Sequence, residues 1–163
     1  MTTLEPLLAE FDHEIAVTRK LLERIPRDRL DWKPHVKSTS MVGLGRHLAH
    51  MITWGLLALT QRTSDVGDRA PMDATPTLSD VLRIFDANAA RVRELLASQT
   101  EAQLAESWSL TWQGQQVLSS PRATVVQSMI LNHLIHHRGQ LSVYLRLNDV
   151  PVPAIYGPSA DES

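Results

Sequence analysis

The chain contains no cysteine, so disulfides, thiolate metal ligands and a cysteine nucleophile are all excluded. Its 16 basic and 18 acidic residues nearly balance, so no strong field of either sign favours nucleic acid or anionic lipid. No apolar run approaches the roughly 18 residues of a membrane span, and residues 1–5 lack the pattern of a secretory signal. We therefore expect a cytoplasmic protein without nucleic-acid or membrane partners.

The composition that remains is typical of a globular protein. Apolar residues make up 43% of the 163 residues, with seven glycines and nine prolines. A chain of this length buries about two-thirds of its surface on folding, which is enough for one core without covalent staples.

Apolar residues recur at helical spacing in four stretches, and no segment alternates convincingly as a strand would. These stretches cover residues 4–25, 40–61, 77–97 and 121–147. Ser40 and Thr77 are suited to cap helix N-termini through their hydroxyls, and Pro26 ends the first helix. The spacing therefore predicts four amphipathic helices.

The connections between these helices differ in length. Residues 62–76 form a polar linker that is long enough to cross one end of a bundle, and residues 98–120 are predicted to be irregular. We predict an all-α fold, a four-helix bundle with a long crossover connection, over residues 1–147. A proline-rich tail over residues 148–163 follows, packed on the bundle or extending from it.

Five of the seven histidines fall in two clusters, on the second and fourth predicted helices. His133 and His137 are four residues apart, so at about 100° per residue they lie about 40° apart on the apolar face. His47 lies on the apolar arc of the second helix. His50 and His136 fall about 60° to the side of these positions, at the rim. Three histidines from two helices are thus predicted to point into one core.

A histidine pair at i, i+4 with a third histidine from a neighbouring helix is typical of a metal site. Imidazole suits Zn, Ni, Cu and Fe alike, and three protein ligands leave a position for water or substrate. Neutral ligands leave the full charge on the ion, which favours activation of a bound water or thiol. The alternative is a set of hydrogen-bonded core residues, the usual role of a single histidine on an apolar face.

Residues beside these histidines leave further alternatives open. Arg138 could meet an anionic ligand, although paired arginines are commoner. Gly139 costs roughly 1 kcal/mol relative to alanine inside a helix, which a close helix approach or room beside a metal would explain. Leu131 and Ile135 lie on the far side of the fourth helix and hint at a second apolar surface, for a dimer interface or another part of the bundle.

The two histidine clusters lie in two short motifs. The first spans residues 40–49 and reads SMVGLGRHLA, and the second spans residues 132–141 and reads NHLIHHRGQL. Both motifs resemble those of the DinB/YfiT-like superfamily of metalloenzymes. The segments at 31–34, 144–146 and 150–161 are also similar to this family, so the resemblance covers most of the chain, and residues 98–120 are covered least.

The resemblance implies a four-helix bundle with a long crossover and a divalent metal ion, often Zn or Ni. It assigns that ion to His47, His133 and His137. Homodimers are common in the family, and characterised relatives include transferases that use low-molecular-weight thiols, together with some isomerases and hydrolases. Many relatives carry a carboxylate about one turn after the helix-two histidine, where this chain has His50, Met51 and Ile52.

Three functions are therefore open. The first is a metal-dependent thiol transferase or hydrolase, in which the ion activates water or a low-molecular-weight thiol against a small electrophilic substrate. In this enzyme His50 or His136 would transfer protons. The second is a non-catalytic stress-response protein that binds metal or a small ligand. The third is a structural homodimer whose histidines belong to the core.

Overall fold

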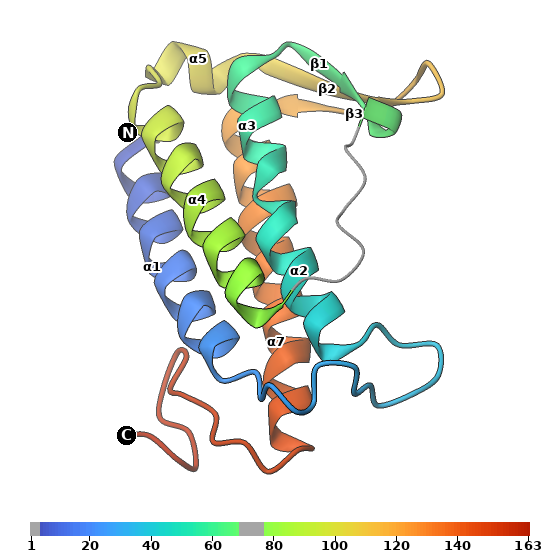
Figure 1. Cartoon of the computed structure of the whole chain (residues 1–163). Helices are drawn as coiled ribbons and strands as arrows, with labels where there is room; N and C mark the ends of the chain where they lie inside the picture. The colour runs from blue at the N-terminus through green and yellow to red at the C-terminus, as the bar shows by residue number, and fades with distance from the viewer. Residues whose placement is uncertain (1–3, 69–76) are drawn as a thin grey trace.

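A computed structural model describes residues 4–68 and 77–163, and these residues are mostly helical. Figure 1 shows long helices side by side, with a small sheet across one end. The α-helices are α1 (Leu4–Glu23), α2 (Met41–Met51), α3 (Thr53–Thr60), α4 (Leu78–Ala97), α5 (Glu101–Ala105), α6 (Arg122–Val125) and α7 (His133–Arg146). A short 3-10 helix, η1 (Val66–Asp68), and a π-helix, η2 (Val126–Asn132), complete the helical segments.

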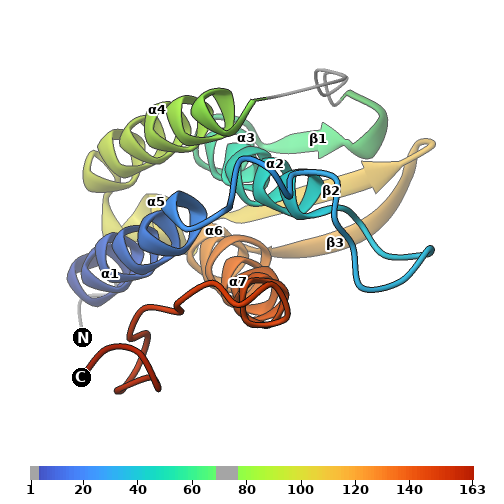
Figure 2. The ribbon, with the colours of Figure 1, turned by 60° about the horizontal axis from the view of Figure 1, so that its bottom comes forward.

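The long helices surround one apolar core. Both α4 and α7 contact α1 and α2, so the order around the bundle is α1, α4, α2, α7, as the view along the helices in Figure 2 shows. Phe11, Leu48 and Phe85 are among the fully buried side chains between them. In Figure 1, α2 and α4 begin at the same end of the bundle. Part of the predicted linker, residues 69–76, lies outside the described residues.

The predicted helix starts at Ser40 and Thr77 are confirmed. The Ser40 hydroxyl accepts a hydrogen bond from the Gly43 backbone N–H at 3.2 Å. Thr77 and Asp80 form a reciprocal capping box, in which each side chain accepts from the other residue's backbone N–H. These caps satisfy donors that the first helical turn leaves without partners.

The predicted helix over residues 40–61 is divided at Ile52 into α2 and α3. The Thr53 hydroxyl donates to the His50 carbonyl at 2.6 Å, and the Gly55 N–H bonds to the Ile52 carbonyl at 2.9 Å, one residue closer than in an α-helix. Close packing against two neighbouring helical segments requires glycine at position 55. An added Cβ would lie 2.8 Å from the Ile130 side chain and 2.9 Å from that of Val92.

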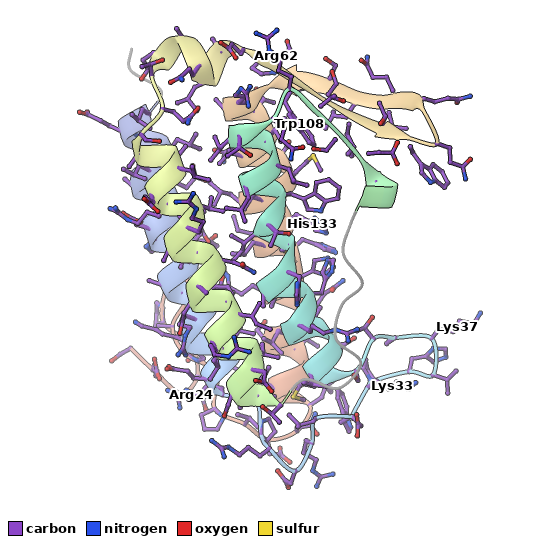
Figure 3. The ribbon with its side chains drawn as sticks, turned by 45° about the horizontal axis from the view of Figure 1, so that its top comes forward. Arg24, Lys33, Lys37, Arg62, Trp108 and His133 are labelled. Carbon is purple, nitrogen blue, oxygen red and sulfur yellow. The ribbon has the colours of Figure 1, made fainter. Side chains whose placement is uncertain are left out.

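The predicted all-α class is not confirmed, because the described residues also form a three-stranded sheet. Its strands are β1 (Thr63–Asp65), β2 (Ser107–Trp112) and β3 (Gln115–Pro121), with β1 parallel and β3 antiparallel to β2. In β2, the buried Trp108 and Leu110 alternate with polar residues, a period of two that the prediction of an irregular segment overlooked. Figure 3 shows Trp108 where the sheet covers the helices.

A two-residue turn explains how the sheet forms within so short a segment. Gln113 and Gly114 both have positive φ, 51° and 77°, as a type I′ hairpin turn requires. The hairpin closes a second, smaller core of Trp54, Ala58, Trp108, Leu110 and Val125 beneath the sheet.

The predicted fourth helix contains a π-helical segment, η2, directly before His133. A π-helix has more residues per turn than an α-helix, so a single helical wheel does not apply across residues 121–147. Leu131 is fully buried in the main core, so it belongs to the bundle and not to a free apolar surface. The explanation of Gly139 by close helix approach is wrong, because an added Cβ there would meet nothing within 4 Å.

Residues 148–163 form no helix or strand, yet they pack on the bundle. Val152 is buried with the main core. Asp161 forms an ion pair with Arg146 and accepts a hydrogen bond from the Val152 N–H at 2.9 Å. Glu162 forms an ion pair with Arg24, just after the end of α1, at 2.6 Å.

Within the described ranges, 4–68 and 77–163, no helix is long and apolar enough to cross a membrane.

Candidate metal centre

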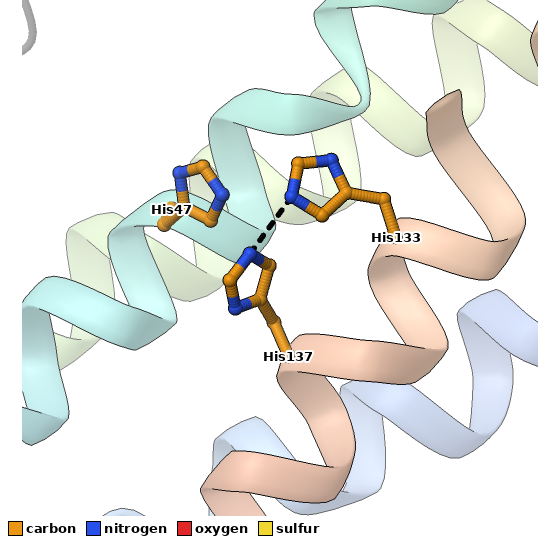
Figure 4. A group of neighbouring side chains, drawn as sticks. All are labelled: His47, His133 and His137. Carbon is orange, nitrogen blue, oxygen red and sulfur yellow. Dashed lines mark hydrogen bonds between the residues drawn. The ribbon is translucent and has the colours of Figure 1, made fainter. Parts of the chain in front are cut away.

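The structure brings His47 of α2 together with His133 and His137 of α7. One ring nitrogen of each lies within 4.8 Å of the others, and all three side chains are half-buried. The ring centroid of His47 is 4.4 Å from that of His137 and 5.3 Å from that of His133 (Figure 4). The structure thus brings together the three histidines that the helical wheel places on facing sides of two helices. The wheel is valid for His133 and His137 because both follow the π-helical segment.

The donor set fits a borderline divalent cation. His133 Nε2 and His137 Nε2 are 2.8 Å apart, the dashed line in Figure 4. Two nitrogen lone pairs repel each other at this distance, so one of the two nitrogens must carry a hydrogen that the other accepts. Imidazole is a preferred ligand of zinc, nickel, copper and iron, and three such ligands are the number found in catalytic zinc sites.

The other ring nitrogen of His137 contacts Gln140. The His137 Nδ1–H donates to Gln140 Oε1 at 2.8 Å. In the neutral ring the hydrogen on Nδ1 leaves Nε2 with its lone pair, and Nε2 is the atom that faces His133.

The two predicted proton-transfer residues lie outside the group of three. His136 is exposed on α7, its ring 4.8 Å from that of His137, and its Nε2 accepts from the Gln140 side-chain amide at 3.1 Å. His50 is half-buried in the last turn of α2, three residues after His47.

A cavity of about 400 Å³ opens beside the histidines. Its described lining comprises Lys37, Ser38, Thr39, Leu44, His47, His137, Gln140 and Tyr144. Sequence analysis had not assigned a role to the loop residues 37–39, because no periodicity links a loop to a helix face. Gln140 was within reach of prediction, since it follows His137 by three residues, nearly one helical turn.

Arg138, next to His137 in sequence, takes no part in this cavity. Its guanidinium is buried and forms an ion pair with the buried Glu14 of α1 at 2.5 Å. It also donates to the Tyr156 hydroxyl at 2.6 Å, and that hydroxyl donates to the other Glu14 oxygen at 2.8 Å. Burial of the hydroxyl and its bond to Glu14 raise the pKa of Tyr156. Arg138 is therefore a paired structural residue that joins α7, α1 and the C-terminal segment.

Comparison with known proteins identifies the family of the chain. The chain matches the DinB family over residues 1–163. It belongs to the DinB family. The chain is 29% identical over 164 residues to the uncharacterized protein YrdA of Bacillus subtilis strain 168, an alignment that covers 98% of this chain and 92% of YrdA.

Solved structures of DinB-like proteins share the fold of this DinB-family chain. A DinB-like protein (YjoA) from Bacillus subtilis has a TM-score of 0.69 at 21% identity, over 97% of this chain and 99% of that one. One from Bacillus cereus ATCC 10987 has a TM-score of 0.69 at 20% identity, over 96% and 100% of the two chains. One from Exiguobacterium sibiricum 255-15 has a TM-score of 0.68 at 19% identity, over 91% and 93%.

Proposed function

We propose that this DinB-family protein is a metal-dependent enzyme that acts on a small electrophilic substrate. His47, His133 and His137 would hold one divalent ion, zinc or nickel, and the nucleophile would be water or a low-molecular-weight thiol. The observation that carries this proposal is the convergence of three half-buried imidazoles beside a cavity of about 400 Å³. A bound divalent ion of this kind lowers the pKa of a bound water or thiol and polarises a carbonyl.

The cavity residues would bind and orient the substrate. The Leu44 side chain is the apolar member of the described lining, and the hydroxyls of Ser38, Thr39 and Tyr144 can donate or accept hydrogen bonds. Pockets that bind small molecules commonly combine apolar surface with a few convergent polar groups. A volume of about 400 Å³ also suits a small molecule better than a macromolecule.

His50 and His136 are our candidates for the proton acceptor. His50 follows His47 by three residues on α2, and His136 is next to His137 on α7. A water or thiol that attacks an electrophile loses its proton to a base within hydrogen-bond reach. Replacing His50 with alanine should lower kcat while the metal content stays that of the wild type.

A turnover screen tests the enzymatic proposal. Protein loaded with zinc or with nickel is assayed against activated esters, and against alkyl or aryl electrophiles with a low-molecular-weight thiol. We expect the wild type to turn over at least one of these substrates and the His137→Ala variant to turn over none of them. Metal binding at full stoichiometry without turnover in any assay would favour the non-catalytic binding protein instead.

The homodimer stays a prediction, which light scattering of the purified protein tests.

A further inference from the structure

Gln140 makes two hydrogen bonds to histidines on its own helix, and their directions differ. Its Oε1 accepts from His137 Nδ1–H at 2.8 Å, and its Nε2 donates to His136 Nε2 at 3.1 Å. Residues three and four apart lie on the same face of a helix, so all three side chains meet within one turn of α7. The exposed His136 is thereby connected to the candidate ligand His137 through one amide.

We propose that Gln140 is a positioning residue for the candidate metal centre, and that His136 holds Gln140 in the required orientation. This inference rests on the proposed function, since it concerns how His137 is prepared to bind a cation. A side-chain amide has one accepting and one donating end. With Oε1 towards His137, the hydrogen of that imidazole stays on Nδ1 and the Nε2 lone pair is free to bind metal.

The opposite orientation of the amide would have the opposite effect. The amide N–H would then face His137 Nδ1, which would have to carry the lone pair, and the hydrogen would move to Nε2. A protonated Nε2 cannot be a ligand. In the structure the donating end of the amide faces His136 Nε2, which leaves Oε1 to face His137 Nδ1.

Hydrogen-bond partners of ligand histidines commonly orient the ring in this way, and their loss lowers metal affinity about 10- to 100-fold. Gln140 also lines the cavity, so a substrate could contact it as well. The two roles separate experimentally. A residue that only contacts substrate would change KM and leave the affinity for metal unchanged.

The experiment compares zinc affinity, by competition with a chromophoric chelator, across the wild type and four variants. Gln140→Leu should bind zinc about 10- to 100-fold more weakly. Gln140→Glu retains an acceptor for Nδ1–H and should bind at least as tightly as the wild type. His136→Ala should show a smaller loss than Gln140→Leu, since the amide remains but is free to rotate. Gln127→Leu is the matched control, because it removes a Gln side chain that bonds Glu10 at 2.8 Å elsewhere.

Two spectroscopic readouts separate positioning from general damage. Co²⁺ bound to Gln140→Leu should show an altered visible spectrum, which Gln140→Glu restores. In metal-free protein, ¹⁵N NMR should find the hydrogen of the neutral His137 ring on Nδ1 in the wild type and shifted towards Nε2 in Gln140→Leu.

The outcomes distinguish this inference from the proposed function. If Gln140→Leu binds zinc within about twofold of the wild type, or if Gln140→Glu is as weak as Gln140→Leu, the positioning role is overturned. An unchanged His137 tautomer in Gln140→Leu overturns it too. If the wild type binds no metal but the tautomer shifts as expected, the proposed metal centre fails and the positioning of His137 by Gln140 stands.

Discussion

His137 and Arg138 are neighbours in the sequence, yet they belong to two polar clusters of opposite character. Arg138 points towards α1, where the buried Glu14 neutralises its charge, and it donates a hydrogen bond to the hydroxyl of the exposed Tyr156. His137 points towards α2, where it meets two other histidines at the side of a cavity. Successive residues on a helix are about 100° apart, so one dipeptide can serve two faces.

The difference shows what distinguishes a structural polar cluster from a candidate site. In the Arg138 cluster, opposite charges and hydrogen bonds compensate for burial. In the histidine group, three groups of the same type converge, and two of their nitrogens approach to 2.8 Å. Under the proposed function a shared cation would stabilise this convergence, and without metal a hydrogen bond joins the two ring nitrogens of His133 and His137.

The largest effect on stability is expected from breaking the Arg138 cluster. Arg138→Met leaves Glu14 buried without its cation and should lower the free energy of unfolding by about 3–5 kcal/mol in urea denaturation. Adding Glu14→Gln to this variant should restore part of the loss, because no charge then remains buried. The control is Arg146→Met, whose exposed ion pair with Asp161 should contribute far less to stability because solvent screens it. An equal cost for Arg138→Met and Arg146→Met would contradict the structural role of the first.

The histidine group should respond to metal instead. Zinc at about 100 times its Kd should raise the free energy of unfolding of the wild type by about 2.7 kcal/mol, and that of His137→Ala by far less. Without metal, the two proteins should unfold at similar urea concentrations, because the His137 side chain is only half-buried. Zinc stabilisation of His137→Ala equal to that of the wild type would place the binding elsewhere.

Tyr156→Phe should lower the free energy of unfolding by an intermediate amount, and this loss should depend on pH in the alkaline range. Burial and Glu14 raise the pKa of Tyr156, so the fold favours the protonated hydroxyl. That contribution is present below the unfolded pKa of about 10 and is lost as the pH rises through the higher folded pKa. The stability difference between wild type and Tyr156→Phe should therefore shrink above pH 10. A difference independent of alkaline pH would show that this hydroxyl does not titrate with unfolding.

The smallest effect is expected at Asp161, which is exposed. Hydrogen bonds from Arg146 and from the Val152 N–H lower the pKa of Asp161. Its contribution is therefore present above the unfolded pKa of about 3.9 and is lost as the pH falls through the lower folded value. Asp161→Asn should be slightly less stable than the wild type at pH 7 and equal to it in strong acid. High salt should reduce the difference in stability between the wild type and Asp161→Asn at pH 7, since exposed charges are screened.

Local patterns predicted the parts of the fold that local physics determines. The hydroxyls of Ser40 and Thr77 cap the N-termini of α2 and α4, as predicted. The helical wheel predicts that His133 and His137 share a face because both lie within one regular helix. The sheet was missed, although the alternation around Trp108 and the glycine at 114 were visible signals.

Other features depend on contacts that sequence spacing does not encode. The π-helical segment η2 contacts α3 and α1, and its start carries no distinctive residue type. The partners of Arg138 come from α1 and from the C-terminal segment, far away in the chain. The loop residues 37–39 reach the cavity only because α2 and α7 lie side by side.

The most direct test of the metal centre is the metal content of untagged protein, purified without chelator and then incubated with zinc or nickel. Elemental mass spectrometry should find about one divalent ion per chain in the wild type and none in His47→Ala, His133→Ala or His137→Ala. The Arg146→Met variant should retain the ion as a control. A wild type that holds no ion after incubation, or histidine variants that retain it, would contradict the assignment of these three residues.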